Sequence, residues 1–305
     1  MHTRAYLSLA AICLIWGTTY TAIKLAIRDF PPYMLVFMRQ TAAGLMLLGI
    51  ALAAGKLIVP DRKYLARQCI TGLCTITGGN GFITWGMQHV PSGLASIIGS
   101  LTPIVVLLIN LFWGQAERPN GRMLAGILLG FGGIVFIFSE GWENFFQTDY
   151  LLGILGCFGS CFTWSLGTVM AKRWNAPGVS PMLNAGLQIT AGGLGGGLLS
   201  LFFDKTHVIH HSIEGWSALL YLVLFGSALA FTLYMYALKH LSATVSSLYT
   251  YINPIVAILF GWMWLHEHLS VWELVGMSLT LAGVWLVNQG ARLQTAAALK
   301  GPGRH

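Results

Sequence analysis

Charged residues are scarce in this sequence: they make up 9% of it, whereas hydrophobic residues make up 55%. A soluble domain carries about 25% charged residues. No soluble fold could hide this much apolar surface, so lipid must be the solvent for most of it. A net charge of +7 is also found in nucleic-acid-binding proteins, but here the basic residues lie in short loops between apolar segments and not on one face of a domain. We expect an integral membrane protein that contacts the lipid bilayer and no nucleic acid.

The centres of the apolar segments lack aspartate, glutamate and histidine. A membrane-embedded enzyme needs a nucleophile with its base, paired carboxylates or a metal cluster deep in the bundle. The five cysteines lie in apolar segments and form neither a CxxC pair nor a zinc spacing. We therefore expect no enzymatic activity, no metal and no cofactor.

Ten stretches are apolar and long enough to cross a bilayer, which takes roughly 20 residues. No A-x-A cleavage site follows the first stretch, so we interpret it as a retained helix rather than a signal peptide. The expected spans cover about residues 6–26, 33–54, 67–88, 92–113, 121–138, 151–171, 181–203, 215–238, 241–263 and 271–289.

The sequence contains an internal repeat. WGTTYTAIK, which begins at Trp16, matches WSLGTVMAK, which begins at Trp164, 148 residues later. Pro103 and the two residues after it match Pro254 and its two followers, 151 residues later. The order of the matches is kept along the chain, so each half is one copy of a common unit.

The repeat predicts the organisation of the chain. We expect a first repeat in residues 1–139, a second in 150–290 and a cytoplasmic tail in 291–305. Each repeat holds five spans, and an odd number turns the second upside down relative to the first. The expected fold is therefore an all-α integral membrane protein of ten transmembrane helices in two inverted five-helix repeats. Secondary transporters with this plan bind substrate near the midplane, where the repeats meet.

The segment from Leu241 to Val287, which begins LSATVSSLYTYINPIVAILF, is similar to the second repeat of the EamA group of the drug/metabolite transporter superfamily. IWGTTYTAIK, MRQTAAGL around Arg39 and VPSGLASIIGSLTPIVVLL are the counterparts in the first half. The resemblance covers essentially the whole chain. It implies ten helices, an inner-membrane location and a central cavity that is often used for efflux. It does not select a substrate, because relatives export amino acids, other metabolites and drug-like cations.

Polar and aromatic side chains near the span centres are the candidates for a substrate site. Such side chains are costly in lipid, so we expect them to face the bundle interior. There they either line the site or bond one helix to another. The candidate substrate-binding residues are Trp16, Tyr20, Arg39, Asn80, Thr84, Trp85, Ser100, Trp164, Gln188, Tyr234, Tyr249 and Asn253.

Two features inside the spans each have two readings. Arg39 is the one strong charge well inside a span, and either it binds substrate or it pins helices together. Its partner in the repeat is Gln188, which is also polar. Pro103 and Pro254 remove a backbone hydrogen bond from the carbonyls of Gly99 and Thr250. Those carbonyls either bind substrate or water, or the prolines only kink the helices.

Transport of a small organic metabolite, such as an amino acid, by alternating access at a midplane cavity is the function that the pattern favours. Export of drug-like cations or sugar-derived metabolites is the alternative, ahead of a membrane-embedded enzyme or a non-transporting scaffold. The sequence carries no signal for an oligomeric state.

The charge distribution predicts the orientation of the chain in the membrane. If both termini are cytoplasmic, 13 of the 17 lysines and arginines fall on the cytoplasmic side, where basic residues accumulate in membrane proteins. Fusion reporters at the C-terminus and in the loop at residues 141–148 should therefore report opposite sides. A result that places both reporters on the same side would contradict the ten-span arrangement.

Overall fold

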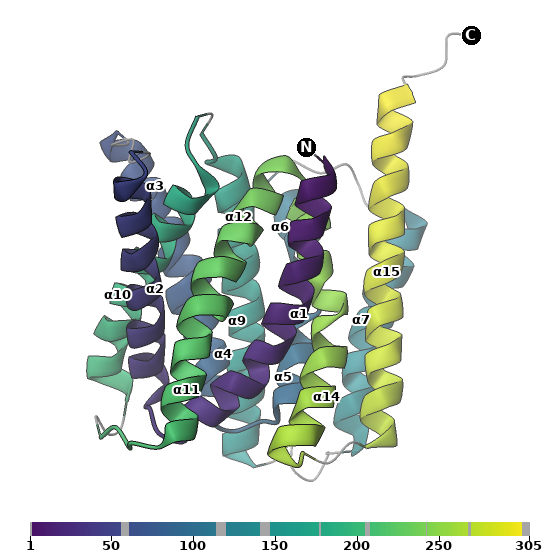
Figure 1. Ribbon diagram of the computed structural model, residues 1–305. Coiled ribbons are helices and arrows are strands. Elements are labelled where there is room, and N and C mark those ends of the chain that lie inside the picture. Colours follow the sequence, from purple (N-terminus) through teal and green to yellow (C-terminus); the bar gives the residue numbers. More distant parts are fainter. Residues whose placement is uncertain are drawn as a thin grey trace.

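The protein is a helical bundle in the computed structural model, which describes residues 2–55, 61–113, 120–140, 147–176, 178–204, 208–241, 243–267 and 270–300. No strand occurs among these residues. The first helix begins and the last helix ends at the same end of the bundle (Figure 1). The first half contains α1 (His2–Ala26), α2 (Pro32–Ala53), α3 (Arg62–Gly72), η1 (Leu73–Asn80), α4 (Gly81–Gly86), α5 (Ser92–Gly99), α6 (Thr102–Phe112) and α7 (Gly121–Glu140).

The second half contains α9 (Thr148–Arg173), α10 (Pro181–Phe203), α11 (Ile213–Tyr221), η2 (Leu222–Leu229), α12 (Ala230–His240), α13 (Ala243–Ser246), η3 (Ser247–Tyr251), α14 (Asn253–Leu265) and α15 (Val271–Lys300). Seven helical spans of the described residues are long and apolar enough to cross a membrane. The runs α3–η1–α4, α7 and α13–η3–α14 bring the number to ten, as the sequence predicts.

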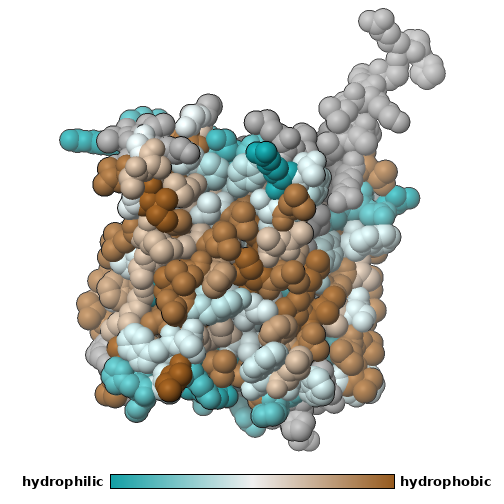
Figure 2. Space-filling view, viewed as in Figure 1, coloured by the Kyte–Doolittle hydropathy of each residue, from teal (hydrophilic) through white to brown (hydrophobic). Residues whose placement is uncertain are grey.

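The surface is apolar around the middle of the bundle and hydrophilic toward its two ends (Figure 2). Exposed leucine, phenylalanine and tryptophan side chains, among them Leu128, Phe162 and Trp285, cover the lateral surface. Because such a band is stable only against hydrocarbon, the bundle axis runs across the bilayer.

The two halves of the chain pack against each other in matched pairs. α2 packs against α10, and α7 packs against α15. α1 packs against α12 and α14 of the second half, while α9 packs against the corresponding α4 and α6 of the first half. Each contact thus has a counterpart in which the two halves change roles, so both halves contribute equally to the bundle centre.

A lysine near the end of the first helix in each half makes the same interaction. Lys24 Nζ of α1 donates to the carbonyls of Met87 (2.5 Å) and Val90 (2.9 Å) at the end of α4. Lys172 Nζ of α9 donates to the carbonyl of Leu238 (2.7 Å) at the end of α12. The last carbonyls of a helix have no partner within that helix, and a cation is favoured there. Each lysine thus joins the first span of its half to the third span of the same half at a membrane boundary.

Acidic side chains stabilise the beginnings of other helices. Asp204 accepts hydrogen bonds from the backbone nitrogens of Tyr33 (3.2 Å) and Met34 (2.9 Å) at the start of α2. Glu267 accepts from the backbone nitrogen (3.0 Å) and the hydroxyl (2.6 Å) of Ser92 at the start of α5. The first N–H groups of a helix need such acceptors. The acids therefore serve at the ends of the spans and are not needed at their centres.

Glycine allows a close helix contact between α7 and α15. A Cβ atom at Gly133 would lie 2.5 Å from Thr280 Oγ1 and 2.6 Å from the carbonyl oxygen of Gly276. A Cβ atom at Gly126 would lie 2.5 Å from the carbonyl oxygen of Gly283. Small residues let helices approach in a membrane, where lipid gives no hydrophobic drive between them.

We predict that Gly133→Ala lowers the thermal unfolding midpoint of the purified protein in detergent, because the added methyl group overpacks the interface at a cost of about 1–3 kcal/mol. Gly132→Ala is the matched control, since a Cβ atom at the adjacent Gly132 would meet nothing within 4 Å. Equal midpoints for the two variants would show that glycine at position 133 is not required for packing.

Candidate functional site

The backbone departs from the regular α-helix at matched places in the two halves. η1 (Leu73–Asn80) and η2 (Leu222–Leu229) are wide π-helical turns inside the third and eighth spans, and their first residues are 149 positions apart. Such turns occur often at functional sites. Gly79 and Asn80 of η1 and Gly226 and Ser227 of η2 border one central cavity.

The fourth and ninth spans are interrupted in the same region. α5 ends at Gly99 and α6 begins at Thr102, with Pro103 in its first turn. Pro103 has no backbone N–H to donate to the Gly99 carbonyl. This carbonyl instead accepts a hydrogen bond from Thr102 Oγ1 (2.7 Å). The ninth span changes from η3 to α14 at Asn253, ahead of Pro254. Gly99, Thr102 and Asn253 border the same cavity as the wide turns.

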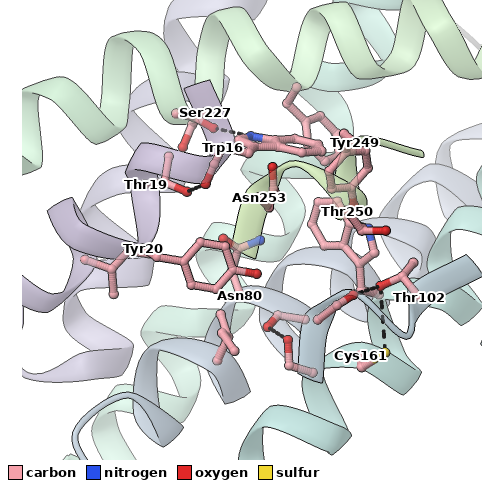
Figure 3. A pocket seen from close by; sticks show the side chains of 18 of the residues that line it. Trp16, Thr19, Tyr20, Asn80, Thr102, Cys161, Ser227, Tyr249, Thr250 and Asn253 are labelled. Atoms are coloured by element: carbon pink, nitrogen blue, oxygen red, sulfur yellow. Dashed lines mark hydrogen bonds between the residues drawn. The ribbon is translucent and has the colours of Figure 1, made fainter. Parts of the chain in front are cut away.

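The cavity has a volume of about 90 Å³ and receives side chains from both halves. Trp16, Tyr20, Asn80, Tyr249 and Asn253 lie around a common space (Figure 3). Pockets for drug-sized ligands span about 300–1,000 Å³, so this conformation fits only a small solute. The lining residues are Trp16, Thr19, Tyr20, Ile23, Arg39, Gln40, Gly79, Asn80, Ile83, Gly99, Thr102, Ser160, Cys161, Trp164, Gly226, Ser227, Phe231, Tyr249, Thr250 and Asn253.

Aromatic rings form one wall of the cavity, with Trp16 at its centre. Its ring centroid lies 4.7 Å from that of Tyr249, 5.4 Å from that of Trp164 and 5.2 Å from that of Tyr234. The contacts with Tyr249 and Trp164 are edge-to-face, a geometry that stabilises a fixed arrangement of the rings. Trp16 Nε1 also donates to the carbonyl of Gly226 (2.9 Å) in η2, so the first span is bonded to the wide turn of the eighth.

Seven of the twelve residues predicted from the sequence line the cavity. They come from the first, second, third, sixth and ninth spans, which the fold brings together at the bundle centre. The seven are Trp16, Tyr20, Arg39, Asn80, Trp164, Tyr249 and Asn253.

The other five predicted residues lie behind the lining or away from it. Tyr234 is fully buried and packs against Trp16 without bordering the cavity, and its hydroxyl is hydrogen-bonded to that of Thr168 at 2.6 Å. Gln188 Nε2 donates to Gln68 Oε1 (2.6 Å) at the contact of α10 with α3. These two side chains bond helix to helix, which is the second reading that the sequence left open.

The remaining three lie in the first half of the chain, where Thr84 and Ser100 are buried and Trp85 is partly buried. Ser100 Oγ donates to the carbonyl of Ile97 (2.6 Å) within its own helix. Trp85 packs against His89, with ring centroids 5.2 Å apart, and Thr84 is buried in the same helix, α4. None of the three borders the cavity.

Several lining residues were not among the candidates. Gln40 follows Arg39 directly, and Ser227 carries the hydroxyl that binds Arg39. Ser160 Oγ donates to the carbonyl of Gly79 (2.7 Å), which holds α9 against η1. Serine is common on apolar helices, so residue type alone does not identify Ser160 and Ser227 as lining residues.

Arg39 is the only charged residue among the described residues that line the cavity. It lies on α2, and 4% of its surface is exposed. Its Nε donates to Ser227 Oγ of η2 (2.8 Å). No group of three or more histidine, cysteine or acidic side chains that could hold a metal ion occurs in the described part of the chain.

Comparison with known proteins places the chain in a family. The model of the EamA-like transporter family matches it twice, over residues 3–139 and 151–289. YedA of Escherichia coli (strain K12), named an uncharacterized inner membrane transporter, is 30% identical over 296 residues, which cover 97% of this chain and 94% of YedA. YvbV of Bacillus subtilis (strain 168), named an uncharacterized transporter, is 27% identical over 298 residues, or 97% of this chain and 95% of YvbV.

A solved crystal structure has the same fold, with a TM-score of 0.70 at 21% identity, and the match covers 96% of this chain and 99% of that one. The fold, the double family match and the relatives define a multi-pass inner-membrane transporter. The chain belongs to the EamA-like transporter family.

Proposed function

We propose that the protein moves small organic metabolites, amino acids among them, across the inner membrane by alternating access at the central cavity. The observation that carries this proposal is the position of the cavity where the two halves meet, bordered by matched irregular segments of both. Transporters built from inverted repeats bind substrate at such a place. Rocking of one repeat against the other would open the cavity to each side in turn, with export as the expected physiological direction.

The size and lining of the cavity support a small solute over the alternatives. A volume of about 90 Å³ does not suit a drug-like cation. The same small volume argues against a sugar-derived metabolite, although hydrogen-bonding side chains such as Asn80, Ser227 and Asn253 line the cavity. The described lining contains no carboxylate and no histidine, so it supports neither catalysis nor a proton relay. We therefore propose exchange or downhill movement of the solute without a coupled proton.

Transport by purified protein in liposomes tests this function. We expect radiolabelled small metabolites, screened one by one, to include a solute that equilibrates without an imposed pH or sodium gradient. Trp16→Leu and Asn80→Ala should each slow entry of this solute about tenfold, which corresponds to a loss of roughly 1.4 kcal/mol of interaction free energy with the solute. Trp85→Leu is the matched control, because Trp85 has the same size but does not border the cavity.

Two outcomes would contradict the proposal. Equal rates for the Trp16 and Trp85 variants, at equal protein incorporation, would place the solute path elsewhere. Accumulation of the solute against its gradient after a pH jump, with matched proton flux, would contradict uncoupled movement.

A further inference from the structure

Arg39 is a buried cation without a counter-ion in the described part of the structure. Its side chain is 4% exposed, and among the described residues it makes one hydrogen bond, from Nε to the neutral hydroxyl of Ser227. The N–H groups of its two terminal nitrogens donate to no described residue, and no carboxylate is among the described residues that line the cavity with Arg39. Removing a charge from water costs several kcal/mol unless an opposite charge and hydrogen bonds compensate for it.

The position of Arg39 does not fit a structural pin at a helix end. It lies seven residues after Pro32, the first residue of α2, so it is about two turns inside the helix. It bonds to a hydroxyl in the middle of η2 rather than to terminal carbonyls, in contrast with Lys24 and Lys172. Gln188, its partner in the repeat, is neutral and bonded to Gln68 away from the cavity. The cavity therefore carries one positive charge, which the second half does not duplicate.

We propose that Arg39 is the subsite for a carboxylate, so that the transported solute is a small organic carboxylate with an apolar body. A guanidinium presents parallel N–H groups that match the two oxygens of a carboxylate. Ser227 fixes Nε and so leaves the terminal nitrogens for the solute. The aromatic wall around Trp16 contacts the apolar part. In a medium of low dielectric constant the same charge repels a cationic solute.

This proposal rests on transport through the central cavity and adds the charge of the solute to it. It assigns different parts of the solute to different walls of one small space. Arg39 and Ser227 belong to α2 and η2, whereas Trp164 and Tyr249 belong to α9 and η3. A bound carboxylate would thus connect elements of both halves and neutralise the cavity during the conformational change.

Titration of intrinsic tryptophan fluorescence tests the subsite, because Trp16 and Trp164 line the cavity. The probes share one carbon skeleton: 3-methylbutanoate, 3-methylbutanamide and 3-methylbutylamine. We expect the carboxylate to bind at least tenfold more tightly than the amide or the amine. In Arg39→Gln this preference should disappear, and in Arg39→Lys, which keeps the charge, it should be partly retained. Arg28→Gln is the control, because Arg28 is exposed at the end of the first span.

Thermal unfolding of the same variants without a probe separates this role from a structural one. An unpaired buried charge does not stabilise the empty protein, so Arg39→Gln should keep or raise the unfolding midpoint. A lowered midpoint with equal loss of binding for carboxylate and amide would overturn the subsite. So would the absence of saturable quenching by any of the three probes. If Arg39→Gln moves a solute in liposomes at the normal rate while Trp16→Leu does not, the carboxylate subsite is wrong and the transport function stands.

Discussion

Inside a bilayer a backbone N–H or C=O group has no water to bind, so irregular backbone is tolerated there only against protein or a cavity. This constraint determines where the site lies. The wide turns η1 and η2 and the breaks before Pro103 and Pro254 are the main departures from the α-helix within the described spans, and all four border one space. Their places match between the two halves, so the cavity has two related sides.

The same constraint accounts for the distribution of charge. Glu267 and Asp204 bind the free N–H groups at helix starts, and Lys24 binds free carbonyls at a helix end, all at the boundaries of the membrane. Charges so placed keep partners and partial contact with water. Arg39 is the exception in the described spans, because its hydrogen-bond partner there is the neutral hydroxyl of Ser227. A cavity with polar groups, an aromatic wall and one positive charge can take a small solute that supplies the negative charge.

The sequence predicts the fold better than the site. Apolar length and the internal repeat are properties of segments about 20 residues long, and they determine the number of spans without knowledge of any contact. The lining depends on which face each helix turns inward. Asn80 and Ile83 line the cavity and Thr84 does not, although Asn80 and Thr84 share a face at 3.6 residues per turn. The wide turns of η1 change the direction in which the following side chains point. No residue type in Leu73–Asn80 predicts such turns from the sequence.

The repeat is also a limited guide to individual roles. It pairs Arg39 with Gln188, yet one borders the cavity and the other bonds to Gln68. Tyr234 was predicted from its depth along the helix, but it packs against lining residues such as Trp16 and does not itself border the cavity. Depth along a helix follows from residue number, whereas the order of side chains from the cavity outward is set by packing between spans distant in sequence.

The central claim is that the solute passes through the cavity shared by the two halves. Cys161 allows a direct measurement, because its thiol borders this cavity and the other four cysteines can be replaced. Modification of this single thiol by a small neutral methanethiosulfonate should stop solute movement in liposomes, and the Cys161→Ala protein should be insensitive to the reagent. Normal transport by protein in which mass spectrometry finds Cys161 fully modified would contradict the account.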